Sequence, residues 1–141
     1  MTQTNSERLR IFVDLVWNQG DIDQADGFIA ARYDIRHDPG DPWDGKTLTL
    51  DGFKERVRIS RAPFPDQQFS FVDMSDAENR VMAMWTWHGT HKGDLPGFPA
   101  SGRSISMTGA TIYYFDGDRI CGHWQVADRL SVWRQLSMPE T

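Results

Sequence analysis

The sequence is poor in cysteine, because Cys121 is the only one among 141 residues. A single cysteine cannot form an intramolecular disulfide, so we expect a fold without disulfides in a reducing compartment, the cytoplasm. No apolar run approaches the roughly 20 residues that a transmembrane helix needs. The first 17 residues contain no basic stretch followed by an apolar one, so we also expect no signal peptide. These absences predict a soluble cytoplasmic protein without a membrane partner.

An excess of positive charge is also missing. The formal net charge is −5 and the sequence pI is about 5.2. Nucleic acids are bound by basic surfaces, so we expect no nucleic-acid partner. The sequence contains no P-loop and no serine nucleophile motif. No two of its histidines have metal-ligand spacing on one helix face, so we expect no metal site, although His37, Asp38 and His91 could form one if folding brought them together.

Aromatic residues, in contrast, are abundant. The chain has six tryptophans and eight phenylalanines, and many of its aromatic residues lie in the second half. They either build a large core in one domain of ordinary size or line a cavity for a flat, apolar ligand. We therefore treat residues 1–141 as a single domain and keep both interpretations open.

Hydrophobic periodicity divides the chain into two halves. A period of 3.6 residues predicts helices over residues 4–20, 21–29 and 50–60. Alternation with period 2 then predicts strands over residues 67–75, 79–91, 104–115 and 119–126, followed by a helix over residues 128–136. This order, with helices first and strands after, is typical of an α+β domain with an antiparallel sheet.

Both faces of the predicted sheet carry apolar side chains. In residues 81–87, Met82 and Met84 point to one side while Trp85 and Trp87 point to the other. A sheet covered on one side only should have a polar outer face. We therefore expect a second copy of the chain to cover the outer face, in a homodimer or homotetramer; loops or the last helix could cover it instead.

Asp128 is the leading candidate for a functional carboxyl group. Strand alternation puts Ile120, Trp124 and Val126 on the apolar face, with Asp128 at the end of this row and His123 on the opposite face. A carboxyl group in an apolar pocket is hard to ionise and can take up a proton and return it near neutral pH. The alternative is that Asp128 is the N-cap of the last helix, and both roles are compatible.

Two histidines and one loop accompany this candidate. His37 ends an extended segment at the expected cavity mouth, and His91 lies where a strand enters a glycine-rich loop. A lone histidine is more often a structural hydrogen-bonding group than a catalyst. The loop over residues 93–102 lies between strands and is predicted to be a flexible lid over the pocket.

Three ordered blocks of the sequence resemble the SnoaL-like polyketide cyclases, also called ester cyclases, of the nuclear-transport-factor-2-like superfamily. The blocks are "VWNQGDIDQADGFIAARYDIRHDP", "WTWHGTHKGDLPGFPASGRSISMTG" and "YYFDGDRICGHWQVADRLSVWRQL". The resemblance covers nearly the whole chain. It implies a cone-shaped, curved antiparallel β-sheet wrapped around N-terminal helices, the SnoaL-like α+β barrel, and oligomers formed through the outer sheet face.

The same resemblance implies a reaction. It makes Asp128 the acid/base of an intramolecular aldol condensation on an aromatic or apolar carbonyl substrate, with no metal and no organic cofactor. His37 and His91 would orient carbonyl groups. The substrate would lie against aromatic walls formed by Trp85, Trp87, Tyr113 and Trp124. Two alternatives remain open because one fold serves many functions: a cofactor-independent hydroxylase or monooxygenase acting on a similar aromatic compound, and a non-catalytic small-molecule-binding protein.

Overall fold

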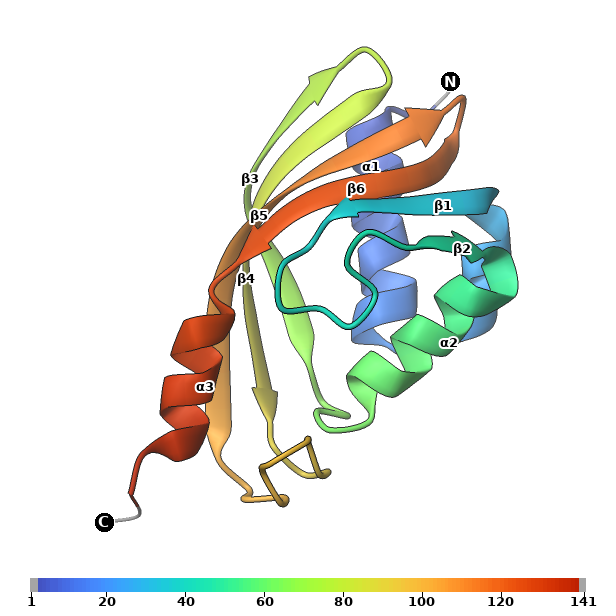
Figure 1. The fold of residues 1–141 in the computed structure, drawn as a ribbon. Helices are drawn as coiled ribbons and strands as arrows, with labels where there is room; N and C mark the ends of the chain where they lie inside the picture. The colour runs from blue at the N-terminus through green and yellow to red at the C-terminus, as the bar shows by residue number, and fades with distance from the viewer. Residues whose placement is uncertain (1–2, 140–141) are drawn as a thin grey trace.

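The computed structural model describes residues 3–139 as one α+β unit (Figure 1). Its helices and strands follow in the order α1 (Asn5–Phe12), β1 (Ile29–His37), β2 (Thr47–Thr49), α2 (Leu50–Arg61), β3 (Gln68–Ala77), β4 (Arg80–Thr90), β5 (Ser104–Asp116), β6 (Arg119–Ala127) and α3 (Arg129–Ser137). A π-helical segment, Val13–Asn18, extends α1, and a 3₁₀ helix, Ile22–Gly27, precedes β1.

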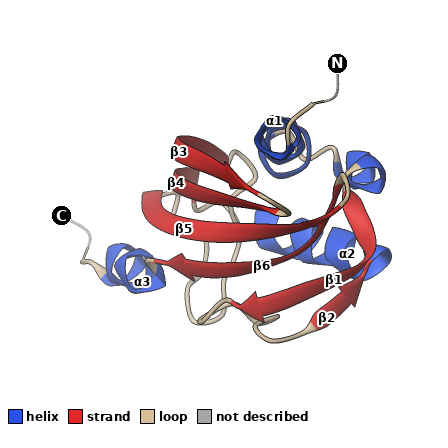
Figure 2. Cartoon of the chain, turned by 90° about the horizontal axis from the view of Figure 1, so that it is seen from above, coloured by secondary structure: helices blue, strands red, loops and turns tan. Residues whose placement is uncertain are grey.

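The six strands form one curved sheet that does not close into a barrel. Their order is β2-β1-β6-β5-β4-β3. All neighbouring pairs are antiparallel except β1 and β6, which run parallel. The sheet curves around α1 and α2, while α3 extends from the end of β6 (Figure 2). The structure thus confirms the predicted α+β class with a curved sheet around N-terminal helices, and it adds the parallel pair.

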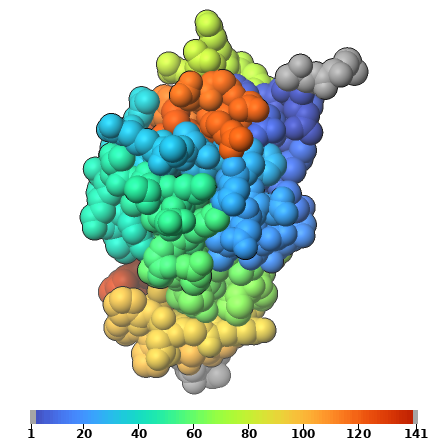
Figure 3. Space-filling view, turned by 90° about the vertical axis from the view of Figure 1, so that its right-hand side faces the viewer, coloured from blue at the N-terminus to red at the C-terminus, as the bar shows by residue number. Residues whose placement is uncertain are grey.

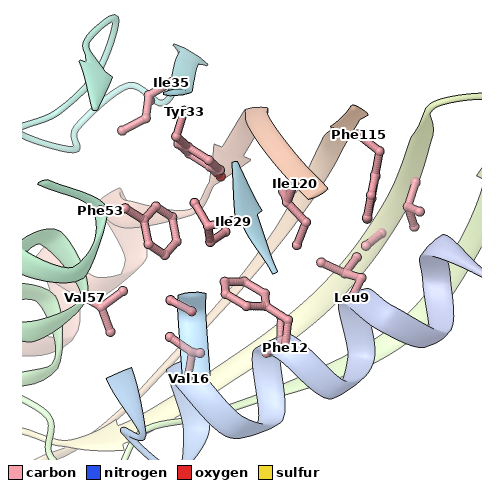
Figure 4. Packing of buried hydrophobic residues seen from close by; sticks show 14 residues of the cluster. Leu9, Phe12, Val16, Ile29, Tyr33, Ile35, Phe53, Val57, Phe115 and Ile120 are labelled. Atoms are coloured by element: carbon pink, nitrogen blue, oxygen red, sulfur yellow. The ribbon is translucent and has the colours of Figure 1, made fainter. Parts of the chain in front are cut away.

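The main core lies between the concave face of the sheet and the two long helices (Figure 4). Phe12 of α1 and Phe53 of α2 are each only 1% exposed, and their ring centroids lie 6.0 Å apart. Leu9 and Val16 continue the buried side of the first helix, as the period of 3.6 predicts. Burial of these side chains fixes the positions of α1 and α2 against the sheet. The two helices therefore form one wall of the space that the curved sheet encloses.

Side-chain caps begin both long helices. The hydroxyl of Thr4 accepts a hydrogen bond from the backbone N–H of Glu7 and starts α1. The hydroxyl of Thr49 accepts one from Gly52 N–H at 3.1 Å and starts α2. The predicted helix over residues 21–29 was too long, because Ile29 pairs with Ile120 and begins β1. Local periodicity did not show this long-range pairing.

Irregularities in two strands reverse which side chains point inward. The pairing of β5 with β6 shifts register between Tyr114 and Phe115, and Cys121 has no partner there. The pairing of β1 with β6 also shifts between Ile35 and His37. An extra residue in one strand exchanges the two faces beyond it. Every prediction that carried alternation past these points therefore placed its residues on the wrong face.

The outer face of the sheet is apolar, as predicted. Five large apolar side chains on it are between 40% and 66% exposed: Val72, Met82, Met84, Trp124 and Val126. Within residues 3–139, no helix is long and apolar enough to span a membrane.

Candidate active site

A cavity of about 700 Å³ opens between the concave sheet face, α2, the loop of residues 92–103 and α3. This size suits a small organic molecule. Apolar side chains form most of its surface: Val13, Trp17, Trp43, Phe64, Phe69, Phe71, Trp85, Trp87, Leu95, Phe98, Met107, Val132, Trp133 and Leu136. The loop of residues 92–103 lies beyond the end of α2 and forms one end of the molecule (Figure 3). The predicted lid segment therefore contributes directly to the cavity wall.

Trp85 and Trp87 face this cavity from β4, as their alternation predicts. They are 2% and 5% exposed. Each indole N–H has a partner, because Trp85 Nε1 donates to Thr111 Oγ1 at 2.8 Å and Trp87 Nε1 donates to Gln67 Oε1 at 3.3 Å. Tyr113 of β5 also lines the cavity. Three of the four predicted aromatic walls are thus at the cavity surface.

A hydrogen-bonded row of three side chains, Tyr33, His123 and Asp38, forms the polar end of the cavity. The Tyr33 hydroxyl lies 2.6 Å from His123 Nδ1, and His123 Nε2 lies 2.9 Å from Asp38 Oδ2. Tyr33 and His123 line the cavity. Asp38 is 0% exposed and lies behind them. The arrangement joins a phenol at the cavity surface to a buried carboxylate through one imidazole.

Asp38 is surrounded by donors from several elements. Arg129 Nη1 lies 2.7 Å from its Oδ1, Arg56 Nη2 lies 3.2 Å from its Oδ2, and Gln125 Nε2 lies 3.2 Å from both oxygens. Burial disfavours the charged carboxylate, but the hydrogen bond from His123 and the arginine charges outweigh burial. The pKa of Asp38 therefore lies below its usual value. The carboxylate is the charged member of the row.

Burial also favours the neutral forms of the other groups at the polar end, and for these groups it outweighs the opposing influences. It lowers the pKa of His123, although the hydrogen bond to Asp38 partly opposes this effect. It raises the pKa of Tyr33 well above the usual value and raises the pKa of Tyr113 to about 12. At neutral pH the imidazole is neutral and both phenols keep their protons. His123 Nε2 then carries a hydrogen toward Asp38, and Nδ1 accepts the Tyr33 hydroxyl.

Asp128 does not line the cavity, contrary to the predicted inward position. Its side chain is exposed and accepts a hydrogen bond from Ser131 N–H at 3.1 Å, so it is the N-cap of α3. The irregularity at Cys121 is the cause, because it turns His123 and Gln125 inward and moves the row of Trp124, Val126 and Asp128 outward. The capping role, the predicted alternative, is the one that the geometry supports.

Trp124 and His37 lie together on the outer face of the sheet. Trp124 is 40% exposed, and its ring stacks on the His37 imidazole at a centroid distance of 4.3 Å and an angle of 10°. Neither residue lines the cavity. The irregularity at Cys121 turns Trp124 outward, and the irregularity between Ile35 and His37 accompanies the outward position of His37. The predicted positions of Trp124 as a wall and of His37 at the cavity mouth are therefore wrong.

His91 is fully buried and anchors the loop of residues 92–103. Its Nδ1 lies 2.8 Å from Ser101 Oγ, and its backbone carbonyl accepts from the N–H groups of Ser101 and Gly102. The imidazole does not line the cavity. His91 thus holds the loop that forms the wall, and the structure does not bring it together with His37 or Asp128.

The sequence patterns do not indicate Tyr33, Arg56 and Arg129 as site residues. They indicate Asp38 only as a possible metal ligand, and they place His123 on the opposite face from the one it occupies. One signal was available, because Tyr33 and Asp38 lie at either end of a short polar segment that enters a turn-rich loop. Among residues 3–139, no group of three or more His, Cys, Asp and Glu side chains is placed to hold a metal ion.

Comparison with known proteins gives a consistent result. The SnoaL-like polyketide cyclase family matches residues 7–136. A candidate polyketide cyclase from Acidithiobacillus ferrooxidans is 48% identical, with a TM-score of 0.91 and 96% of each chain covered. IdmH, a candidate polyketide cyclase from Streptomyces antibioticus, is 25% identical, with a TM-score of 0.82, 96% of this chain covered and 100% of that chain.

A third structure shares the fold alone. AclR, a candidate hydroxylase from Streptomyces galilaeus, is 20% identical with a TM-score of 0.73, and the match covers 98% of this chain and 86% of that chain. No curated protein matches the sequence significantly. The extent of the family match and the identity to the Acidithiobacillus protein both exceed what a shared fold alone requires, and the chain belongs to the SnoaL-like polyketide cyclase family.

Proposed function

We propose that this protein is a cyclase-type enzyme that closes a ring by intramolecular aldol condensation on an aromatic or apolar carbonyl substrate. The observation that carries the proposal is the row Tyr33–His123–Asp38 at the polar end of an otherwise aromatic cavity. In this proposal the acid/base work belongs to that row and not to Asp128, which caps α3. Family membership supports the reaction class.

The resting state of the row suits a proton relay. A phenolate at Tyr33 is disfavoured because burial raises the pKa of Tyr33, so the phenol oxygen is not a strong base by itself. The neutral imidazole of His123 can take the phenol proton at Nδ1, and the Asp38 carboxylate stabilises the imidazolium that forms. Tyr33, His123 and Asp38 correspond to the hydroxyl, the base and the orienting carboxylate of other hydrogen-bonded triads.

The reaction then consists of proton transfers around one C–C bond formation. A C–H proton beside a substrate carbonyl moves to the Tyr33 oxygen as the Tyr33 proton moves to His123 Nδ1, which leaves an enolate. The enolate carbon attacks a second carbonyl carbon of the same molecule and forms the ring bond. The resulting alkoxide takes a proton from Tyr33, and His123 returns its proton to Tyr33. No oxidant or reductant enters this sequence.

Tyr113 and Arg56 also lie at the polar end of the cavity and can assist the reaction. Tyr113, with a pKa of about 12, stays protonated and can donate to a substrate carbonyl oxygen. Arg56 lines the cavity, and its charge is matched by Asp38 and by Asp41, whose Oδ2 lies 2.9 Å from Arg56 Nη2. The aromatic walls exclude water around the reacting carbons and hold a flat substrate in place.

The test uses a panel of aromatic β-keto esters that carry a second carbonyl in reach. Wild-type protein in D₂O should incorporate deuterium at the acidic carbon and release the ring-closed product. Tyr33→Phe should lower both rates about 100-fold or more, the usual contribution of a positioned acid or base. Tyr114→Phe is the matched control, because Tyr114 does not line the cavity. Its ring instead lies under the Arg36 guanidinium, whose Cζ is 3.6 Å from the ring centroid.

The remaining outcomes separate the alternatives. Oxygen consumption linked to turnover would point to a hydroxylase, the description that AclR carries. Tight binding of the panel without deuterium exchange or product would point to a non-catalytic binding protein. Equal activity of Tyr33→Phe and wild type would remove Tyr33 from the mechanism.

We also propose that a second copy of the chain covers the outer sheet face. The exposed Met82, Met84, Trp124 and Val126 surround a shallow groove on this face. Single exposed apolar residues are common on protein surfaces, but a contiguous apolar sheet face is a typical interface. The cavity opens on the opposite, concave face, so such an assembly leaves the polar end of the cavity unobstructed.

A further inference from the structure

A second hydrogen-bonded chain crosses the concave face of the sheet and also ends at Asp38. Trp85 Nε1 donates to Thr111 Oγ1 at 2.8 Å, and Thr111 Oγ1 donates to Gln125 Oε1 at 2.6 Å. Gln125 Nε2 then donates to both carboxylate oxygens of Asp38 at 3.2 Å. Trp85, Thr111 and Gln125 come from the adjacent strands β4, β5 and β6, and Thr111 is paired directly with Gln125.

The direction of this chain is fixed by its first member. An indole N–H can only donate, so the Thr111 oxygen accepts from Trp85 and its own hydrogen must go to the next acceptor. That acceptor is Gln125 Oε1, which leaves the amide nitrogen facing Asp38. The reversed amide would place Oε1 against a carboxylate and its nitrogen against a hydroxyl whose hydrogen then has no acceptor.

The other groups around Asp38 and His123 do not hold the carboxylate in the same way. Arg56 comes from α2 and Arg129 comes from α3, each on a long side chain. Arg129 is 28% exposed, and it bridges to Asp41 at 3.6 Å. Gln125 Nε2 donates to both oxygens of Asp38. Gln125 also lies on the same strand as His123, two residues away and on the same inward side. Its amide is therefore placed to hold the rotation of the carboxylate relative to the imidazole.

We infer that Trp85, Thr111 and Gln125 act as a positioning arm, which holds Asp38 as a hydrogen-bond acceptor for His123 and so keeps the imidazole proton on Nε2. Nδ1 is then free to accept the Tyr33 hydroxyl. The three residues are positioning residues, and their catalytic consequence rests on the proposed function. The hydrogen-bonding arrangement itself does not depend on turnover and can be tested without a substrate.

The test measures the ring nitrogens of His123 by NMR over a range of pH, with its signals assigned from the His123→Gln variant. Wild type should show a neutral imidazole with hydrogen on Nε2 near pH 7. Gln125→Leu removes the donor and leaves Asp38 more negative toward His123. We expect the His123 titration midpoint to rise by about half a pH unit or more. Thr111→Val should move it in the same direction by less, and Trp85→Phe by less again.

A double variant tests whether Thr111 acts through Gln125. If it does, Thr111→Val combined with Gln125→Leu should match Gln125→Leu alone. Thr86→Val is the matched control, because Thr86 is exposed on the outer side of β4 and should leave His123 unchanged. Thr111→Ser keeps the hydroxyl and should titrate like wild type.

Three results would overturn the inference. They are an unchanged or lowered His123 titration midpoint in Gln125→Leu, additive effects in the double variant, and a wild-type imidazole with hydrogen on Nδ1. If Thr111→Val does not fold, Trp85→Phe decides the question, since it removes one N–H and keeps an aromatic wall. The His123 titrations can support the positioning arm even if no β-keto ester reacts. Failure of this inference and failure of the proposed function are therefore distinguishable.

Discussion

His123 Nε2 lies 2.9 Å from Asp38 Oδ2, although 85 positions separate the two residues in the sequence. Their side chains are 4% and 0% exposed. A buried carboxylate is costly unless charges and hydrogen bonds offset its lost hydration. Arg56 and Arg129 supply the charges, and His123 and Gln125 supply further hydrogen bonds.

Asp38→Asn should impair both function and stability. The substitution removes the negative charge that compensates Arg56 and offers an N–H group to His123 Nε2, so turnover should fall about 100-fold or more. Loss of one partner in a buried ion pair should lower the free energy of unfolding by about 3 kcal/mol. Urea denaturation and the ring-closure assay measure the two effects. Asp116→Asn, at an exposed position at the end of β5, is the control, and equal behaviour of the two variants would contradict a special role for Asp38.

Acidification should destabilise the protein in two stages. The pKa of His123 is lowered in the folded state, so its contribution is complete above about pH 6.5 and is lost as the pH falls toward the folded pKa. The lowered pKa of Asp38 adds a second loss below about pH 3.9. Unfolding free energies measured from pH 8 to about pH 2 should therefore stay level down to about pH 6.5, decrease below it, and decrease again below about pH 3.9. His123→Gln should remove the first stage, and a first stage that persists in this variant would assign it to another group.

The sequence was sufficient for those parts of the fold that local patterns determine. The helix starts near Asn5 and Leu50 and the alternation of Trp85 with Met84 follow from short-range spacing, and each is present in the structure. The cavity walls on β4 were predictable for the same reason, because β4 shows uninterrupted alternation over residues 80–89.

The polar end of the cavity was not predictable in this way. It depends on two irregular strand pairings, near Cys121 and near His37, that exchange inward and outward faces. In the local sequence near Cys121, only Gly122 distinguishes a bulge from a regular strand. At Gly122, a Cβ atom would lie 2.5 Å from the backbone oxygen of Asp34, so the approach of the parallel strand β1 requires this glycine. A glycine inside a strand was the one available hint of a bulge or of close backbone contact.

Asp128 should behave as a helix cap and not as an acid/base. Asp128→Ala removes the acceptor for Ser131 N–H and should cost about 1 kcal/mol of stability, with turnover retained. Asn is an equally good cap, so Asp128→Asn should match wild type in stability and in rate. A folded Asp128→Asn protein without turnover would instead identify Asp128 as the acid/base and would refute the relay through Tyr33.

Met84→Glu should break the proposed assembly through the outer sheet face. Met84 is 50% exposed and lines the groove on this face, and a buried glutamate without a partner would oppose association. Light scattering should show a wild-type dimer or tetramer and a variant of 16.2 kDa, the mass of one chain. Gln24→Glu introduces the same charge at an exposed position in the 3₁₀ helix and should leave the assembly intact. A monomeric wild-type protein would contradict the proposed assembly through this face.

Gly109→Ala should disturb the cavity wall through Trp85. The two residues are paired across β4 and β5, and a Cβ atom at position 109 would lie 2.2 Å from Trp85 Cζ2. The indole must move, which should strain its hydrogen bond to Thr111 and cost about 1–3 kcal/mol of unfolding free energy. Urea denaturation measures this cost, and quenching of tryptophan fluorescence by a flat aromatic ligand measures cavity binding. Gly27→Ala is the control, because its Cβ would meet nothing within 4 Å.

A second substitution identifies the clash as the cause. Trp85→Phe shortens the ring that Gly109 accommodates, so the double variant Trp85→Phe/Gly109→Ala should be less destabilised than the sum of the two single variants. Additive losses would mean that the alanine acts elsewhere in the sheet and that Trp85 does not need Gly109. Because Trp85 also begins the hydrogen-bonded chain to Asp38, Gly109→Ala should raise the His123 titration midpoint, whereas Gly27→Ala should leave it unchanged.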